Sequence, residues 1–171
     1  MTVPPEWVLI FLEKTLALPP GHRWVLDFDD HIEPDHPNSG WKKYIRNTSA
    51  RFKCSKCGRS WPSNRVMVVF HMCLIDTKGV VKVRIFRQKC KNCSDAQMEK
   101  PSIDSENIKI LLENLVEKIR RNCYFEDIGS KNRNPKSIDV KSPHEPDHCE
   151  ACMKGVCTRN DASAVFKPDF Y

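Results

Sequence analysis

Three Cys-x-x-Cys pairs limit what this chain can fold into more than any other feature. The pairs are Cys54/Cys57, Cys90/Cys93 and Cys149/Cys152. A thiolate is a strong zinc ligand, and the two-residue spacing lets both sulfurs of a pair reach one tetrahedral ion from a single turn. The chain has nine cysteines, an odd number, and lacks the long apolar run of a secretory signal, so zinc is favoured over disulfides. The sequence therefore predicts a fold organised by metal.

The first two pairs predict one closed zinc site. Its expected ligands are Cys54, Cys57, Cys90 and Cys93. Four thiolates complete the tetrahedral shell and leave no open position for water or substrate, so such an ion stabilises the fold and does no chemistry. A redox Cys-x-x-Cys motif would instead place one pair before a helix in a βαβ unit, and that context is absent.

The last cysteine block predicts a second zinc site, a small knuckle closed by local sequence. Its expected ligands follow the pattern His-x4-Cys-x2-Cys-x4-Cys and are His144, Cys149, Cys152 and Cys157. His148 is a rival ligand, although its position beside Cys149 aims it poorly at the same ion. In the alternative interpretation Cys149 and Cys152 complete another site, and His144 is a solvated loop residue. Two zinc ions per chain are expected.

Other side chains with metal-binding or stacking chemistry have simpler interpretations. Cys73 and Cys123 are expected to be small buried hydrophobic residues, and His71 to be packed or hydrogen-bonded on its strand. Trp61 is expected to supply core area, with base stacking as the alternative. The sequence shows no nucleophile–base pairing, no paired carboxylates and only six glycines, so it does not predict an enzyme.

Hydrophobic patterning predicts an α+β fold. Helices are expected over residues 6–18, 42–46 and 102–123, and strands over 23–28, 51–54, 66–75 and 80–87. The turn Asp76-Thr77-Lys78-Gly79 predicts a long hairpin that places Cys90 across from about Arg65, where residues 58–64 also bring Cys57. The expected architecture is a zinc-ribbon-like antiparallel sheet with a long hairpin, packed by N-terminal and C-terminal helices, plus a small C-terminal zinc knuckle.

Composition sets the expected boundaries within the chain. Residues 1–128 are predicted to form the α+β core, residues 129–143 a polar linker, residues 144–158 the His/Cys knuckle that completes the domain, and residues 159–171 a tail.

Charge is unevenly distributed along the chain. Residues 1–40 carry 2 basic and 7 acidic side chains, whereas residues 41–100 carry 15 basic and 3 acidic ones. Some of these basic side chains offset the net negative charge of a four-thiolate zinc centre. The remainder predict a cationic face that could contact an RNA backbone or the anionic surface of a membrane. Its expected members are Lys53, Lys56, Arg59, Lys82 and Arg84, the last two on the wet side of an amphipathic strand.

Several blocks of the sequence resemble the three-CxxC zinc finger of receptor-transporting proteins. They are Gly-Trp-Lys-Lys-Tyr at 40–44, Phe-Lys-Cys-Ser-Lys-Cys-Gly-Arg-Ser-Trp at 52–61, Val-Arg-Ile-Phe-Arg-Gln-Lys-Cys-Lys-Asn-Cys at 83–93 and Cys-Glu-Ala-Cys-Met-Lys-Gly-Val-Cys at 149–157. The resemblance implies that the seven cysteines of these blocks are zinc ligands. His144 matches a histidine that the family places just before its last cysteine block.

The resemblance also implies a function. Members of the family help seven-transmembrane receptors of odorant, taste or opioid type to leave the endoplasmic reticulum and reach the cell surface. One interferon-induced branch restricts RNA viruses, so a zinc-dependent RNA-binding antiviral protein is the alternative. Family members typically continue to a hydrophobic C-terminal anchor, whereas this sequence contains no transmembrane segment. The expected location is the cytoplasm, at the cytosolic face of the endoplasmic reticulum or plasma membrane.

Overall fold

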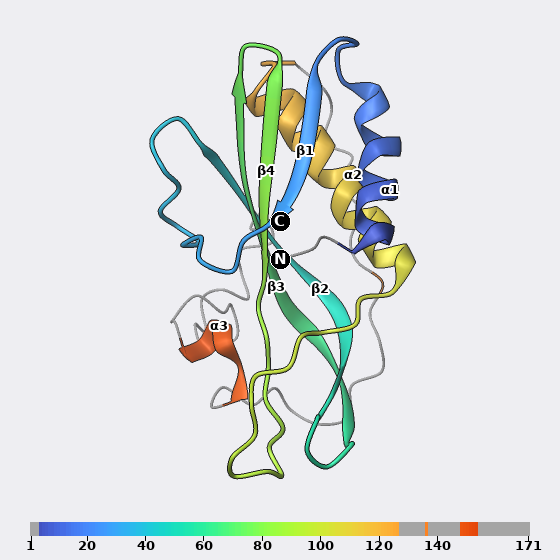
Figure 1. Ribbon diagram of the computed structural model, residues 1–171, viewed down its shortest axis with the longest axis vertical. Helices are drawn as coiled ribbons and strands as arrows, with labels where there is room; N and C mark the ends of the chain where they lie inside the picture. The colour runs from blue at the N-terminus through green and yellow to red at the C-terminus, as the bar shows by residue number, and fades with distance from the viewer. Residues whose placement is uncertain (1–3, 127–135, 137–147, 154–171) are drawn as a thin grey trace. The chain divides into compact units, whose positions relative to one another are not determined.

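The chain divides into two compact units. The computed structural model describes residues 4–126, 136 and 148–153 (Figure 1). The first unit comprises residues 1–45, 69–84 and 105–134, and the second comprises residues 46–68, 85–104 and 135–171. Among the described residues, no helix is both long enough and apolar enough to cross a membrane.

Two long helices and four strands make up most of the fold. In chain order the elements are α1 (Pro5–Lys14), the 3-10 turn η1 (Thr15–Ala17), β1 (Arg23–Phe28), β2 (Lys42–Lys53), β3 (Ser60–Ile75), β4 (Lys78–Ile85), α2 (Ser105–Asn122) and the short α3 (Glu150–Met153). The strands form one sheet in the order β1-β4-β3-β2. The predicted α+β class is confirmed.

The sheet is mixed, so the prediction of a wholly antiparallel sheet is wrong for one strand. β1 runs parallel to β4, with Val25 opposite Val80 and Phe28 opposite Val83. A parallel pair requires a connection of a dozen or more residues. Here the chain between β1 and β4 is long enough, because it contains β2 and β3.

The predicted long hairpin is confirmed as β3 and β4. Only Asp76 and Thr77 separate the strands, and Asp76 has a φ of 57°, the left-handed region that tight hairpin turns require. Towards the open end, the Phe86 N–H donates to the Met67 carbonyl at 3.0 Å. This register brings the chain just before Cys90 beside the start of β3, close to where the sequence predicted it.

Two local predictions are wrong. Residues 42–46, predicted as a short helix, begin β2, because Tyr44 is buried and stacks on Phe70 of β3 with ring centroids 5.9 Å apart. Sheet packing of this kind outweighs weak local helix propensity. Residues 58–64, predicted as a bent connection, include the start of β3, and Pro62 lies within that strand. Pro62 has no N–H to donate, so it contributes only its carbonyl to the sheet.

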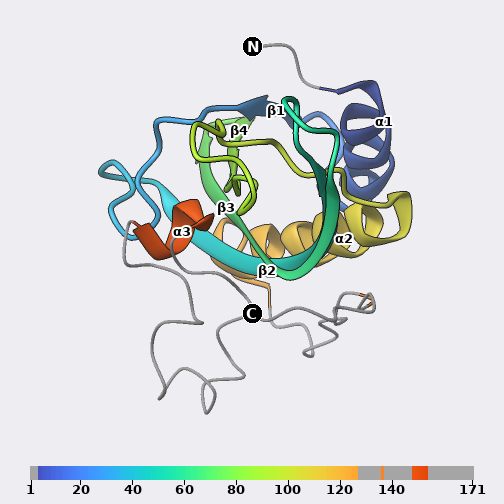
Figure 2. The ribbon, with the colours of Figure 1, turned by 90° about the horizontal axis from the view of Figure 1, so that it is seen from below.

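The helices α1 and α2 lie side by side in the first unit, as both views show (Figures 1 and 2). On α1 the residues Trp7, Ile10 and Phe11 are buried, and Trp7 meets Phe28 of β1 edge to face at 5.3 Å. On α2 the apolar residues at helical spacing, which include Ile108, Leu112 and Ile119, are also buried. Lys14 pairs with Glu113 between the two helices at 3.6 Å. Both helices are a few residues shorter than predicted, and Thr15–Ala17 tighten into η1.

The buried Trp24 leaves no room for a side chain on the neighbouring strand. Trp24 lies opposite Gly79 in the register of β1 and β4. A Cβ atom built on Gly79 would overlap the Trp24 indole, whose Nε1–H donates to the Tyr124 hydroxyl at 3.0 Å. The glycine is therefore required by close approach to Trp24.

We expect Gly79→Ala to destabilise the protein by about 1–3 kcal/mol, because a methyl group cannot fit without displacing a buried ring. Chemical denaturation followed by circular dichroism measures the change in free energy of unfolding. In a Trp24→Ala background the same Gly79→Ala change should cost much less, since the overlapping ring is gone. An equal cost in both backgrounds would contradict this account.

Candidate metal centre

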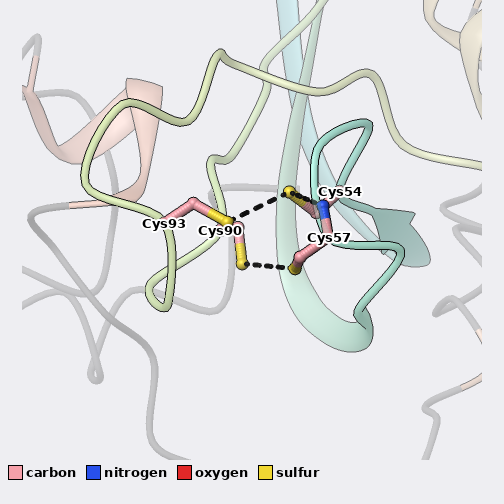
Figure 3. A group of neighbouring side chains, drawn as sticks. All are labelled: Cys54, Cys57, Cys90 and Cys93. Atoms are coloured by element: carbon pink, nitrogen blue, oxygen red, sulfur yellow. Dashed lines mark hydrogen bonds between the residues drawn. The ribbon is translucent and has the colours of Figure 1, made fainter.

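Four cysteine side chains converge in the second unit from two segments far apart in sequence (Figure 3). They are Cys54, Cys57, Cys90 and Cys93, and their Sγ atoms all lie within 4.8 Å of one another. The Sγ atoms of Cys54 and Cys93 are 3.7 Å apart, and those of Cys57 and Cys90 are 3.8 Å apart. A tetrahedral ion with zinc–sulfur bonds of about 2.3 Å places its sulfurs about 3.8 Å from one another. The cluster therefore has the donor set and the dimensions of a four-thiolate zinc site.

The first cysteine turn is shaped to present thiolates. The Cys54 N–H donates to the Arg59 carbonyl at 2.8 Å, and Gly58 adopts a φ of 76° to close the turn. Inside it, the backbone N–H groups of Lys56 and Cys57 point at the Cys54 Sγ, at 3.4 and 3.5 Å. The donation from the Cys57 N–H, above all, lowers the pKa of Cys54 to about 7.

The pKa of Cys93 is raised, whereas that of Cys54 is lowered. Its hydrogen bond with the Cys57 thiol raises the pKa of Cys93 to about 12, and burial and the charge of Cys54 act the same way. A second thiolate beside the first is unfavourable unless a cation lies between them. A divalent ion removes that conflict and releases protons on binding. Without metal, the cluster thus favours a thiolate at Cys54 and a thiol at Cys93, whereas a bound cation allows both to be thiolates.

The residues after Cys93 hold the first cysteine turn in place. The Glu99 carboxylate accepts hydrogen bonds from the Ser55 backbone N–H at 2.9 Å and from its hydroxyl at 2.7 Å. The first of these bonds lowers the pKa of Glu99. Gln97 donates to the same hydroxyl, and Lys56 pairs with Asp95 at 2.7 Å. The hydrogen bonds to Ser55 are outer contacts of the kind that fix the orientation of metal ligands, whereas the Lys56–Asp95 pair is exposed and contributes less.

Gln88 is a central residue of this region that the sequence analysis did not identify. It is buried, accepts a hydrogen bond from the Trp61 indole at 2.9 Å and donates to the Ser63 hydroxyl at 3.0 Å. Its backbone also pairs with Glu99 on one side and Cys149 on the other. Its sequence signal is its place in the family-like block at 83–93, which does not distinguish a buried linker from a surface residue.

Trp61 belongs to the packing of the second unit. Its ring stacks on Phe52 with centroids 5.4 Å apart, and the Arg59 guanidinium lies 4.7 Å from the ring centroid. The interpretation of Trp61 as core area fits these contacts better than base stacking does.

The third cysteine block is attached by its backbone to the strand that leads into Cys90. The Lys89 N–H donates to the His148 carbonyl at 2.9 Å, and the Glu150 N–H donates to the Arg87 carbonyl at 3.0 Å. Cys149 lies buried between these two bonds. The backbone pairing therefore carries this block to the end of the hairpin that also holds the cysteine cluster.

The predicted second zinc site falls largely outside the described residues. His144, Cys157 and the side chain of Cys152 are not among them. The Nδ1 atom of His148 is buried without a hydrogen-bond partner among the described residues, which keeps His148 in place as the rival ligand. The ligand set of the second site stays a prediction.

The prediction that Arg84 belongs to an exposed cationic face is wrong. Only 5% of Arg84 is exposed, and its guanidinium donates to the Ile32 carbonyl at 2.9 Å, because the acidic loop after β1 covers this part of β4. Lys82 is half-buried, 3.7 Å from Asp29 and over the Trp41 ring. The alternating pattern of the strand correctly predicted that Val81 and Val83 are buried. It could not predict that a loop packs on the opposite face of the strand.

The remaining members of that face lie in the second unit. Lys53 is exposed, Lys56 is paired with Asp95, and Arg59 covers Trp61. They belong to a different unit from Lys82 and Arg84, so the five predicted residues do not form one defined surface.

The simpler interpretations of His71 and Cys73 are confirmed, and that of Cys123 only in part. His71 is buried with its Nε2 atom 3.4 Å from the Pro34 carbonyl, and burial lowers the pKa of His71. Cys73 is buried, whereas Cys123 is only half-buried, and burial raises the pKa of the Cys123 thiol. Neither cysteine is part of the four-cysteine cluster.

The cluster, the hairpin and the two-residue cysteine spacings define a zinc-ribbon protein. A family model described as a zinc-binding domain matches residues 47–155, most of the chain. Similarity to curated relatives assigns the chain to a particular family of zinc-binding proteins. The chain is 36% identical over 167 residues to receptor-transporting protein 3 of Mus musculus and 35% identical over 167 residues to receptor-transporting protein 2 of Mus musculus. It is also 31% identical over 166 residues to receptor-transporting protein 4 of Homo sapiens.

The chain belongs to the receptor-transporting protein family. The three alignments cover 95%, 96% and 95% of this chain, and 35%, 75% and 68% of the respective relatives. The chain thus spans about a third of the length of receptor-transporting protein 3 and three quarters of receptor-transporting protein 2. No solved structure matches the chain.

Removing one thiolate of the cluster should abolish tight zinc binding there, because three protein ligands leave the shell open. We expect Cys90→Ala to contain one zinc fewer than the unaltered protein, whereas the matched change Cys73→Ala keeps the full content. Native mass spectrometry counts the metal, with two ions expected in the unaltered protein. Retention of every ion in Cys90→Ala would contradict the assignment, and a single ion in the unaltered protein would leave the third cysteine block without its proposed role.

Glu99 should contribute to metal affinity without touching the ion. We expect Glu99→Ala to weaken zinc binding by about tenfold or more, because the Ser55 turn loses the carboxylate that holds it. Competition with a chelator of known affinity measures the change. Asp95→Ala is the matched control, since Asp95 is an exposed acid on the same segment, and its loss should change the affinity far less. Equal effects from both variants would contradict the positioning role of Glu99.

Proposed function

We propose that the chain is a zinc-dependent, chaperone-like adaptor that promotes the trafficking of seven-transmembrane receptors to the cell surface. The observation that carries the proposal is family membership together with an assembled four-cysteine cluster. The relatives are named for transporting receptors. Receptors of chemosensory or opioid type are the proposed cargo.

Zinc supplies the scaffold for this activity. Cys54, Cys57, Cys90 and Cys93 are proposed to hold the first ion. Cys149, Cys152 and Cys157, with His144 or His148, are proposed to hold the second. A closed four-ligand shell offers no position for a reacting water, so the proposed role is binding and not catalysis. Free thiolates persist in a reducing compartment, which favours the cytosolic face of the endoplasmic reticulum or plasma membrane.

RNA binding is the weaker candidate. The observation in its favour is the charge of the second unit, whose described residues carry 11 basic and 4 acidic side chains. Against it, Lys56 of that unit has an acidic partner, and two of the five predicted contact residues, Lys82 and Arg84, belong to the first unit, where Arg84 is buried. Contact with an anionic membrane surface would draw on the same charge and meets the same objection.

We expect co-expression of the chain with a panel of seven-transmembrane receptors to raise the amount of receptor at the cell surface, measured by antibody labelling of intact cells. Cys90→Ala should reduce surface receptor to the level seen without the chain, because the metal scaffold is lost. Cys73→Ala should behave like the unaltered chain. Surface amounts that do not change with any receptor of the panel would refute the proposal.

A further inference from the structure

Exposed large hydrophobic side chains gather in the first unit. Those found among the described residues all belong to it: Leu9, Leu12, Leu16, Val25, Ile75 and Phe125. Single exposed apolar residues are ordinary, whereas several on one element indicate a contact surface. Three of the six lie on α1 and the turn that follows it.

Leu9, Leu12 and Leu16 form one continuous strip on the outside of α1 and η1, which we call the leucine ridge. Residues at i, i+3 and i+7 lie on the same side of a helix. The three side chains are 68%, 51% and 83% exposed. The opposite side of α1, which includes Trp7 and Phe11, is buried in the first unit. The helix is therefore apolar on two sides, and the described fold covers only one of them.

Acidic side chains border the leucine ridge. Glu6 precedes Leu9 by three residues and Glu13 follows it by four, so both residues neighbour Leu9 on the helix surface, where the Glu6 carboxylate accepts a hydrogen bond from the Ser105 hydroxyl of α2. The Glu13 side chain is 69% exposed. Lys14, the basic residue of this helix, lies 3.8 Å from Glu13 and 3.6 Å from Glu113, so a single cation faces two carboxylates and the net charge beside the ridge stays negative. The apolar surface is thus presented to a partner with a negative border.

We propose that the leucine ridge binds an amphipathic helix that has an apolar stripe flanked by Lys or Arg side chains. A helix with apolar residues at the same spacings can lay that stripe against the ridge, and its basic flanks complement Glu6 and Glu13. The inference rests on the proposed function, because cytosolic segments next to membrane spans are rich in Lys and Arg. The partner is thus a segment of that kind from a membrane-spanning protein.

The acidic border disfavours the two other occupants of such a surface. Anionic lipid headgroups would be repelled by Glu6 and Glu13. A second copy of the chain would bring its own acidic border to the contact.

The test uses the zinc-loaded full chain and two synthetic probes, each a labelled peptide of about 18 residues that is long enough for five helical turns. One peptide has Leu at helical spacing with Lys elsewhere, and the other has Glu in place of Lys. Fluorescence anisotropy should show the Leu/Lys peptide binding at least about tenfold more tightly than the Leu/Glu peptide. Equal affinities would overturn the proposal, because the acidic border would then play no part.

The chain offers a variant pair matched in exposure. Leu9 and Ile75 are both 68% exposed, and Leu16 and Phe125 are both 83% exposed. We expect Leu9→Gln/Leu16→Gln to weaken binding of the Leu/Lys peptide by about tenfold or more, and Ile75→Gln/Phe125→Gln to leave it unchanged. Unaltered melting temperatures show that both variants are folded. As a second measure, Glu13→Gln should flatten the salt dependence of binding. Equal losses from both double variants would overturn the proposal.

Competing occupants give distinct results. Sedimentation that shows dimers lost in Leu9→Gln/Leu16→Gln and not displaced by the Leu/Lys peptide would assign the ridge to self-association instead. Flotation with phosphatidylserine vesicles that depends on the same leucines and outcompetes the peptide would assign it to a membrane. In the receptor assay, full activity of Leu9→Gln/Leu16→Gln would overturn the ridge as the docking surface and leave the trafficking function standing. Peptide binding by a chain that moves no receptor would overturn the function and leave the ridge.

Discussion

Convergence of four thiols at the open end of a hairpin is the constraint on which the second unit depends. Cys54 and Cys57 precede β3 in the sequence, and Cys90 and Cys93 follow β4. The hairpin formed by these strands brings the second pair back beside the first. Without an ion, the sulfurs compete for protons: the backbone N–H groups of Lys56 and Cys57 stabilise a thiolate at Cys54, and a neighbouring thiolate at Cys93 becomes unfavourable. A divalent cation converts that repulsion into four bonds, so metal binding stabilises the open end of the hairpin.

The supporting contacts make the cluster part of a wider unit. Ser55, Gln88 and Glu99 connect the first cysteine turn, the strand entering Cys90 and the segment beyond Cys93. The third cysteine block adds to the same strand through its backbone. The two units therefore differ in chemistry. The second unit holds the four-cysteine cluster and the excess of basic residues, whereas the exposed large hydrophobic side chains found among the described residues are all in the first.

The sequence predicted features set by short spacings and strong periodicity. The four-cysteine cluster, the hairpin and the buried faces of α1 and α2 all follow from such patterns. It failed where a distant segment decides the outcome. The pattern of its strand predicts that Arg84 faces solvent, but the loop that contains Ile32 covers it. Residues 42–46 form a strand and not a helix because Tyr44 stacks on Phe70 of β3. The parallel pairing of β1 with β4 could not be predicted either, because no local turn connects the two strands.

That parallel pairing has a consequence for biosynthesis. Arg23 pairs with Lys78, and Phe28 with Val83, so β1 must find a partner made 55 residues later in the chain. At about 5–20 residues per second, the ribosome leaves β1 unpaired for several seconds. During that interval Trp24 and Leu26, which the finished protein buries, remain in water. The N-terminal strand therefore completes its pairing late, and its apolar side chains are open to aggregation until β4 has been made.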